Sequence, residues 1–414
     1  MKFCDYSKID CYALNRKQLL SLWFLNLRVM YRILFVASVG LVGASEQAWT
    51  IGSDGFSRAN VLVPSVGIYH GAYADFGALE DEVSATKIQA FEKLAGKKLT
   101  WAYFSNHWLK GEMEFPTANV EACKAAKVIP YIRLLPWSEV KQWQQDPIFK
   151  MDRFLNGDFD QQLRRWARQA IKANTPMILE FGPEVNGEWF SWNGRWQGSG
   201  PGATADSSTN SKKAPVMSDG YGDPEWPDGP EKFRDTYRRL IELFREEGAD
   251  QITWVLHLDV NGTPVGGWNS PRFYDPGPDW IDWIGLSVFG PQVPTDPWDP
   301  FPNQMRRFQK SLMELQYENG KAPRRPRPVL ISEYAAIEDQ SSSKRKADWI
   351  TRTLNSLAFG MFKDVRGLTY WHSPGWLADG SGNFRIDSSK ESLAAYRKGI
   401  QDRAFVVTPV FEGR

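Results

Sequence analysis

From about Ser65 onward the chain alternates short apolar runs with amphipathic stretches, and this alternation constrains the fold more than any other feature. Apolar runs bounded by turn residues predict buried strands, and the amphipathic stretches predict helices that cross back to the same edge of a parallel sheet. The strand candidates are VGIYHGAYA (from Val66), LTWAYFSNHW (from Leu99), VIPYIRLLPW (from Val128), MILEFGPE (from Met177), ITWVLHLD (from Ile252), WIGLSVFG (from Trp283), VLISEYA (from Val329) and GLTYWHS (from Gly367). Eight strands are the number that closes a barrel, so we predict an α/β protein built as a single (β/α)8 TIM barrel.

The connections between these strands differ in character. Apolar residues at helical spacing mark four helix faces, Phe159 to Ala170, Phe233 to Phe244, Met305 to Leu315 and Ile350 to Leu357. The fifth connection, GWNSPRFYDPGPDW, has no such pattern, and we expect no helix there. The segment from Gln197 to Gly229 is rich in Gly, Ser, Pro and Asp, which predicts a long loop after the fourth strand. Such a loop either walls a substrate cleft or has no fixed structure.

The N-terminus carries the pattern of a secretory signal peptide. The segment from Met30, MYRILFVASVGLVGASEQAW, has a basic start, an apolar run and small residues up to Ser45. We therefore predict that residues 1–45 are an N-terminal extension with a signal peptide, that residues 46–414 are the barrel domain, and that the protein is secreted or periplasmic. The first 29 residues do not fit a signal, so Met30 is the expected start. An uncleaved membrane anchor is the alternative, but the apolar run is shorter than the roughly 20 residues that a span needs.

The composition is that of a globular protein able to bury a large core, with 42% hydrophobic and 24% charged residues among 414. A net charge of +1 argues against nucleic acid or an anionic membrane as the main partner. The 19 Trp and 14 Tyr offer flat faces that pack against sugar rings, although most are expected to be core residues. Cys123 is the single cysteine after the signal, so no internal disulfide can form. Separately, we expect the protein to be a monomer.

Two of the strand candidates deliver a glutamate, Glu184 after MILEFG and Glu333 within VLISEYA. Side chains alternate along a strand, so Val329, Ile331 and Glu333 are expected to face the same way. TIM barrels hold their active sites at the C-terminal strand ends, where both glutamates would lie. Because an unpaired buried carboxylate is costly, a glutamate in such an apolar run is functional or paired. Two carboxylates across one pocket are the chemistry of glycoside hydrolysis, which makes Glu184 and Glu333 the candidate catalytic residues.

The motifs around both glutamates resemble those of glycoside hydrolase family 26, the β-mannanase family. The matching stretches are GPEVNGEWFSW, FYDPGPDWIDWIGLSVFG, GADQITWVLH, VLISEYA and Trp371, which together cover most of residues 65–375. The first two are specific, whereas the others alone would be weak. The resemblance implies a retaining (β/α)8 hydrolase in which Glu184 is the general acid/base and Glu333 the nucleophile that forms a covalent glycosyl-enzyme. That mechanism needs the two carboxyl groups about 5 to 5.5 Å apart.

The resemblance also implies residues that contact the sugar. Trp189 and Trp371 would form walls around the bound ring, and Trp192 would extend the platform; the alternative for each is packing at the barrel rim. Asn186 could position the acid or a sugar hydroxyl. His107 is our candidate for substrate contact among four histidines that fall at or near strand ends. None of these histidines has a second His or Cys at ligand spacing, so we expect no metal and no cofactor.

The chain departs from the family pattern at three positions. Pro183 stands where the family has a histidine, Glu180 where it usually has an arginine, and Phe289 where it has a tyrosine that commonly contacts the nucleophile. Each change removes an orienting group. Arg133 on the adjacent strand could pair with Glu180, which would give the same ion pair with its ends exchanged.

These patterns lead to one functional expectation with several alternatives. We expect a secreted endo-acting β-glycanase that cleaves β-1,4-mannan and keeps no membrane association after signal cleavage. Mixed-linkage β-glucan, xylan or an exopolysaccharide are the alternative substrates. Transglycosylation would use the same residues. A carbohydrate-binding protein that has lost activity on a hydrolase fold is the alternative of a different class.

Overall fold

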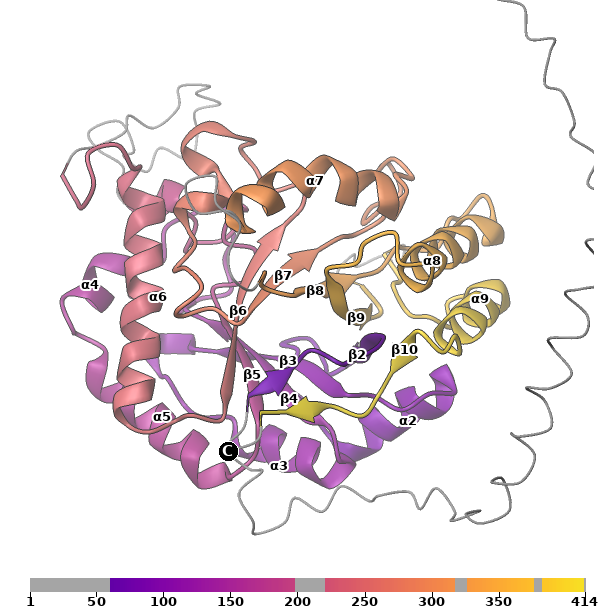
Figure 1. Ribbon diagram of the computed structural model, residues 1–414, viewed down its shortest axis with the longest axis horizontal. Helices are drawn as coiled ribbons and strands as arrows, with labels where there is room; N and C mark the ends of the chain where they lie inside the picture. The colour runs from indigo at the N-terminus through magenta and orange to yellow at the C-terminus, as the bar shows by residue number, and fades with distance from the viewer. Residues whose placement is uncertain (1–59, 198–219, 317–325, 376–381, 413–414) are drawn as a thin grey trace, which may run out of the picture. The chain divides into compact units, whose positions relative to one another are not determined.

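The computed structural model describes residues 60–197, 220–316, 326–375 and 382–412, all of which belong to one compact unit of the chain (Figure 1). The predicted signal peptide, the predicted boundary after residue 45 and most of the predicted long loop lie outside these residues.

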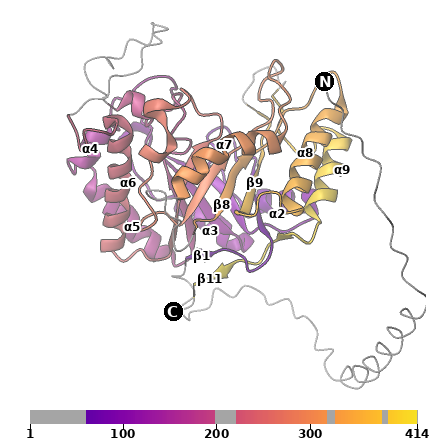
Figure 2. The same ribbon diagram turned by 45° about the horizontal axis from the view of Figure 1, so that its top comes forward.

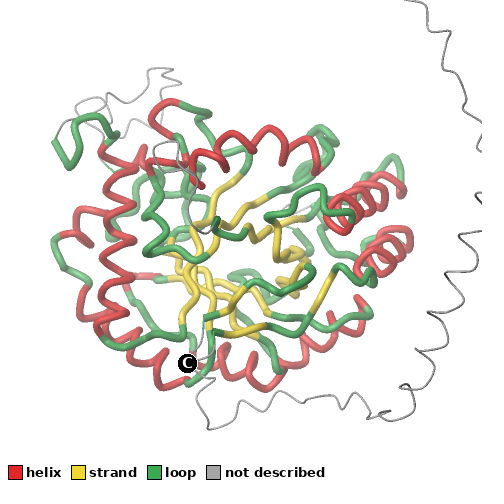
Figure 3. The backbone as a smooth tube through the Cα atoms, viewed as in Figure 1, coloured by secondary structure: helices red, strands yellow, loops and turns green. Residues whose placement is uncertain are grey.

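Parallel strands form a closed barrel surrounded by helices, as Figures 1 and 3 show. The barrel strands are β2 (Ile68–Ala74), β3 (Trp101–His107), β4 (Ile129–Leu135), β5 (Met177–Phe181), β6 (Ile252–Asp259), β7 (Trp283–Ser287), β8 (Val329–Tyr334) and β9 (Val365–His372). Each strand pairs in parallel with the next, and β9 returns to pair with β2 from Tyr69–Gly367 to Ala74–His372. The predicted (β/α)8 barrel is confirmed, with all eight predicted strands in place.

Helices on the outside bury the apolar faces that the sequence predicts. They are α2 (Ala85–Ala95), α3 (Thr117–Ala126), α4 (Met151–Leu155), α5 (Asp160–Ala173), α6 (Asp228–Glu246), α7 (Phe301–Gln316), α8 (Ser343–Ala358) and α9 (Lys390–Ile400). In α6 the buried residues include Phe233, Tyr237 and Phe244, and the Tyr237 hydroxyl donates to the carbonyl of Val255 at 2.7 Å. This bond ties the helix to β6.

The fifth connection follows its prediction. Residues 260–282, all described, hold two short 3₁₀ turns, η5 (Gly267–Asn269) and η6 (Pro271–Phe273), and no α-helix. Two further 3₁₀ turns are η2 (Leu109–Gly111) and η3 (Gly194–Trp196). Among the described residues, no helix is both long enough and apolar enough to span a bilayer.

The end of the barrel where the strands begin is filled by side chains. Trp101 on β3 lies inside it, and its indole N–H donates to the Thr369 hydroxyl at 2.9 Å. A Cβ at Gly71 would lie 1.9 Å from this indole, and one at Gly367 would lie 2.6 Å from it. The two glycines therefore leave room for the Trp101 ring. Ile178, Thr253 and Leu330 line the same internal space.

Short strands lie outside the barrel ring. β10 (Phe405–Val406) adds in parallel to the start of β2, and β1 (Val61–Leu62) pairs antiparallel with β11 (Val410–Phe411), below the barrel strands in Figure 2. The Val61 amide donates to Thr253 and its carbonyl accepts from the Trp283 indole. β1 thus covers the N-terminal ends of β6 and β7.

Candidate active site

A cleft of about 760 Å³ opens at the C-terminal ends of the barrel strands, a size within the range of small-molecule sites. Five of the predicted site residues line it, Glu184, Glu333, Trp189, Trp371 and His107. The other lining residues are Ala78, Leu79, Glu80, Arg133, Leu135, Trp137, Val140, Gln142, Trp143, Phe190, Asp259, Asn261, Phe289 and Gln292. The structure therefore brings both candidate catalytic glutamates into one cleft.

Glu333 reaches the cleft through a β-bulge in β8. The residues of β8 that face the barrel interior are Leu330 and Ser332, whose hydroxyl lies 2.8 Å from that of Tyr131. Simple alternation would turn Glu333 outward. The register with β7 shifts at this point, from Leu286–Ile331 to Ser287–Glu333, and a bulge re-aims the side chain that follows it. The prediction that Glu333 faces the cleft holds, but the alternation used to reach it is wrong.

Glu184 is presented by a tight turn after β5. Gly182 and Glu184 both have left-handed backbones, with φ of 58° and 50°. This conformation is uncommon for a residue with a side chain and tends to cluster at functional sites. A Cβ at Gly182 would also lie 2.9 Å from Phe233 and from Trp192, so glycine is required there. The Trp189 indole then donates to Oε2 of Glu184 at 3.0 Å.

Two donors hold the carboxylate of Glu333. Nη1 of Arg133 and the hydroxyl of Tyr103 both donate to Oε1, each at 2.8 Å. Among the described residues, no hydrogen bond goes to Oε2 of Glu333, which leaves that oxygen for another partner. Arg133 is fixed by Ser105 and Glu80, and its guanidinium lies 4.9 Å from the ring centroid of Trp371.

The expected ion pair between Arg133 and Glu180 does not form. The two residues are Cα partners on β4 and β5, but Arg133 extends to the cleft, where Glu333 and Glu80 lie. Glu180 stays inside the barrel and accepts from the Tyr131 hydroxyl at 2.5 Å and the Tyr103 hydroxyl at 2.6 Å.

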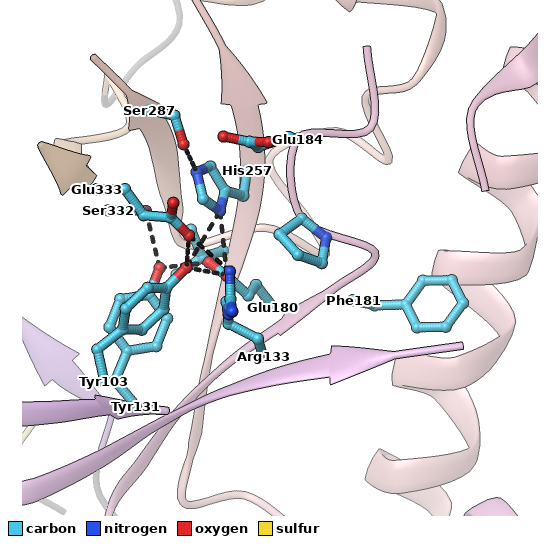
Figure 4. Close-up of polar contacts among 12 residues, drawn as sticks. Tyr103, Tyr131, Arg133, Glu180, Phe181, Glu184, His257, Ser287, Ser332 and Glu333 are labelled. Carbon is cyan, nitrogen blue, oxygen red and sulfur yellow. Dashed lines mark hydrogen bonds and ion pairs between the residues drawn. The ribbon is translucent and has the colours of Figure 1, made fainter. Parts of the chain in front are cut away.

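His257 completes the surroundings of Glu180. Its Nδ1 lies 3.0 Å from Glu180, and its Nε2 lies 2.8 Å from the hydroxyl of Ser287. Figure 4 shows these residues in one connected network with Glu333, while Phe181 turns away toward a helix and Glu184 lies apart. The carboxylate of Glu180 is therefore satisfied without an arginine.

The electrostatics of the site distinguish its acidic groups. Burial raises the pKa of Glu333, the Arg133 guanidinium opposes this shift, and the Glu184 carboxylate adds to it. Burial followed by the charge of Glu184 raises the pKa of Asp259 well above its usual value. Burial disfavours the charged form of His257, but the carboxylates of Glu180, Glu333 and Glu184 together outweigh burial and raise the pKa of the imidazole. Glu333 and Asp259 both sense the charge of Glu184, which is consistent with carboxyl groups that share one cleft.

Trp371 and His107 take different surroundings in the cleft wall. Trp371 stacks on Tyr73 with ring centroids 4.3 Å apart, and its indole N–H has no partner among the described residues. His107 binds the Leu79 carbonyl through Nε2 at 2.9 Å, and burial lowers its pKa. Nδ1 of His107 likewise has no partner in the described part of the chain. Both unpartnered nitrogens belong to residues that line the cleft.

Two of the predicted contacts are wrong. Trp192 is fully buried, stacks on Phe190 and donates to the carbonyl of Pro183 at 2.8 Å, so it braces the turn that carries Glu184. Asn186 is also buried, and its amide group exchanges two hydrogen bonds of 2.8 Å with the backbone of Asp259. Neither side chain is free to bind a sugar.

Sequence reasoning missed Tyr103 and Asp259. Tyr103 supplies the hydroxyl that the family tyrosine, replaced here by Phe289, would give to the nucleophile. Nothing in the sequence distinguishes it from the other tyrosines of the core strands. Asp259 ends an apolar run in the same way as Glu184, and that position was the available signal. Within the described ranges there is no group of three or more His, Cys, Asp or Glu placed to bind a metal.

The fold and the cleft together define a class of protein. A closed (β/α)8 barrel with two glutamates and four tryptophans lining one cleft at the C-terminal strand ends is the arrangement of the glycoside hydrolases. No family model matches the chain.

Solved structures narrow the fold to that of the family 26 β-mannanases. An endo-β-1,4-mannanase double mutant of Cellulomonas fimi superposes with a TM-score of 0.51 at 14% identity, over 82% of this chain and 72% of that one. A family 26 β-mannanase of Bacteroides ovatus gives a TM-score of 0.50 at 13% identity, over 83% and 90%. At these identities the likeness establishes a mannanase-like fold.

A curated relative is similar in sequence. Endoglucanase H of Acetivibrio thermocellus is 22% identical over 339 residues, which cover 81% of this chain. The chain spans 31% of the length of that relative.

Proposed function

We propose that this chain is a retaining glycoside hydrolase that cleaves β-linked glycans. The observation that carries the proposal is the position of Glu184 and Glu333 in one cleft with unlike surroundings. Glu333 is buried and held on one oxygen by Arg133 and Tyr103, which suits a carboxylate that must stay charged and correctly aimed. Glu184 lies on a turn with a left-handed backbone, accepts one indole hydrogen bond and lines the cleft, so its carboxyl group can reach a bound glycoside.

The mechanism follows from these roles. Oε2 of Glu333 attacks the anomeric carbon while Glu184 protonates the leaving glycosidic oxygen, and a covalent glycosyl-enzyme forms. Glu184 then takes a proton from water, which attacks the same carbon and releases a sugar of unchanged anomeric configuration. Arg133 holds Oε1 of Glu333 during both steps, and Tyr103 donates to the same oxygen while the carboxylate is charged.

The lining of the cleft supports a polymeric substrate. Four tryptophans line it, Trp137, Trp143, Trp189 and Trp371, and of these Trp143 and Trp189 keep ring surface exposed that can stack on pyranose rings. We propose endo action on β-1,4-mannan as the first activity to test, because the two proteins of similar fold are mannanases. The sequence similarity to an endoglucanase makes β-glucan the second activity to test.

A polysaccharide panel tests both proposals. We expect wild-type protein to release reducing ends from β-mannan or mixed-linkage β-glucan. Glu333→Gln and Glu184→Gln should each lower kcat by at least roughly 100-fold, the lower end for loss of a general acid. Glu188→Gln is the matched control, because Glu188 lies on the same turn, pairs with Arg195 and does not line the cleft.

Two outcomes would overturn the proposal. Proton NMR of the first product should show the β-anomer, and an α-anomer would mean an inverting mechanism. Binding of the polysaccharides without turnover by the wild type would favour the inactive carbohydrate-binding protein.

We also propose that the protein is secreted through the segment from Met30 to Ser45 and acts as a monomer. N-terminal sequencing of exported protein should begin shortly after Ser45. Light scattering gives the mass in solution. Exported protein that still carries residues 30–45 would contradict the proposed signal peptide. A mass in solution equal to that of a dimer would contradict the proposed monomer.

A further inference from the structure

Three buried polar side chains lie inside the barrel, beneath the cleft, and have no role in the proposed reaction beyond the hydrogen bond from Tyr103 to Glu333. Tyr103, Glu180 and His257 lie on β3, β5 and β6, and all three are buried. None of these three lines the cleft. Tyr103 nevertheless donates to the carboxylate of Glu333, and Glu180 and His257 are linked to that carboxylate through Tyr103, as Figure 4 shows.

The hydroxyl of Tyr103 lies between two carboxylates. Its oxygen is 2.8 Å from Oε1 of Glu333 and 2.6 Å from Oε1 of Glu180. Both separations are hydrogen-bond distances, but a tyrosine hydroxyl has one proton to donate. Burial, followed by the charges of Glu180 and Glu333, raises the pKa of Tyr103 well above its usual value. The hydroxyl therefore keeps its proton, and the two carboxylates compete for it.

Each carboxylate has further donors, so neither depends on Tyr103 alone. Glu180 accepts from the Tyr131 hydroxyl at 2.5 Å and lies 3.0 Å from Nδ1 of His257. Glu333 accepts from Arg133 at 2.8 Å. Hydrogen bonds to an ionised acceptor are about twice as strong as neutral ones. The position of the Tyr103 proton is thus decided by which carboxylate carries a full charge.

We propose that the Tyr103 hydroxyl is a two-position donor, which donates to Glu333 while that carboxylate is charged and to Glu180 while Glu333 is esterified in the glycosyl-enzyme. The inference rests on the proposed function, because it needs the ester intermediate. Glu180 is then a positioning residue that acts through Tyr103.

The proton balance of each step is simple. When Oε2 of Glu333 bonds to the anomeric carbon, the bond to the leaving oxygen breaks, Glu184 gives that oxygen its proton, and Glu333 loses its charge. The O–H of Tyr103 then rotates toward the carboxylate of Glu180. No proton leaves Tyr103, and both acceptors are already within reach. Attack by water restores the Glu333 carboxylate and reverses the rotation.

The consequence is a stabilised intermediate. While Glu333 is an ester, Tyr103 makes its stronger bond to Glu180, which lowers the free energy of the glycosyl-enzyme. At both transition states Glu333 carries only part of its charge while Glu180 is unchanged, so the gain from Tyr103 there is the alignment of Oε2 of Glu333 with the anomeric carbon. Tyr103 should therefore speed both chemical steps, whereas Glu180 should set how long the intermediate lasts.

A burst experiment separates these two effects. The probes are 2,4-dinitrophenyl β-mannobioside and β-cellobioside, whose dinitrophenolate burst reports formation of the glycosyl-enzyme and whose steady state reports its hydrolysis. Tyr103→Phe should slow both steps by roughly 10- to 100-fold, the effect of a hydrogen bond to a charged group. Glu180→Gln should shrink the burst, because a neutral amide accepts the Tyr103 hydrogen bond more weakly than a carboxylate does. The rate constant for formation of the glycosyl-enzyme, divided by that for its hydrolysis, should fall about tenfold.

Tyr131→Phe is the matched control. It removes a hydrogen bond of 2.5 Å to Glu180 from the neighbouring strand and leaves the contacts of Glu333 intact. The burst should not decrease in this variant. Near-UV circular dichroism shows whether the Glu180→Gln enzyme folds. If it folds and keeps the wild-type ratio of glycosyl-enzyme formation to hydrolysis, Glu180 is only structural and the inference is overturned.

A second measurement needs no substitution. The wild-type enzyme trapped with a 2-deoxy-2-fluoro glycoside should show, in its crystal structure, Tyr103 closer to Glu180 and farther from Glu333 than in the free enzyme. If Tyr103 stays with Glu333 in the trapped enzyme, the inference fails while the proposed function stands. If the wild type hydrolyses no polysaccharide of the panel, the proposed function fails first.

Discussion

Arg133 balances the buried charge of Glu333, so replacing it with methionine tests the electrostatics of the site. The side chains of Arg133 and Glu333 are 8% and 5% exposed, and their ion pair is 2.8 Å long. Removal of one partner from a buried pair costs about 3 to 5 kcal/mol, because the other charge is left without compensation. We expect Arg133→Met to lower the free energy of unfolding by that amount at pH 7. Arg195→Met is the control, since its pair with Glu188 is more exposed and such pairs contribute at most about 1 kcal/mol.

The loss should depend on pH with a definite sign. Burial already raises the pKa of Glu333 above its usual 4.5, and without Arg133 it rises further. As pH falls from 7 toward 4.5, the folded variant takes up a proton that the unfolded chain does not yet bind, so its stability recovers. Urea unfolding at pH 7 and pH 5 should show the gap to wild type narrowing at pH 5.

A double-mutant cycle gives the refutation. Glu333→Gln removes the charge that Arg133 balances, so Arg133→Met should cost much less in that background than in the wild type. Additive losses, or a gap that stays constant with pH, would refute the assignment of Arg133 as the counter-ion of Glu333.

Three further predictions concern groups around the barrel. Gly182→Ala should lower the free energy of unfolding by about 1 to 3 kcal/mol and reduce kcat, as measured by urea titration and steady-state kinetics. Gly248→Ala is the control, because Gly248 also has a positive φ but no atom lies within 4 Å of the new Cβ, and this variant should retain full kcat. Burial raises the pKa of the Cys123 thiol, so a disulfide reagent should label it only after unfolding, and fast labelling of the native protein would contradict this. Burial lowers the pKa of Lys346 to about 7, so wild-type stability should rise between pH 7 and pH 9, and Lys346→Met should lose this rise in urea titrations.

The barrel was predictable because its signals are local. Each strand is an apolar run between turn residues, and each main helix carries its own apolar stripe. The helix-free fifth connection was predictable for the same reason, since Pro and Gly interrupt it. These patterns do not depend on contacts between distant parts of the chain.

The details of the site depend on such distant contacts. The bulge that turns Glu333 inward arises from its register with β7, which no local pattern encodes. Trp192 is of a residue type that often stacks on sugars, but the turn buries it, and its indole N–H donates to the carbonyl of Pro183. Arg133 and Glu180 are indeed neighbours across two strands, yet side-chain length sends the arginine to a different layer. The role of Tyr103 could not be predicted, because it depends on hydrogen bonds to Glu180 and Glu333, which lie far from Tyr103 in the sequence.

The Trp101 ring, seated against Gly71 and Gly367, closes the floor of the barrel, and this decides how a polymer can use the cleft. A glycan bound as proposed would enter and leave from the side of the cleft. Because Trp101 fills the barrel beneath, such a polymer would lie across the top, and both cleavage products would leave on the side from which the intact chain arrived.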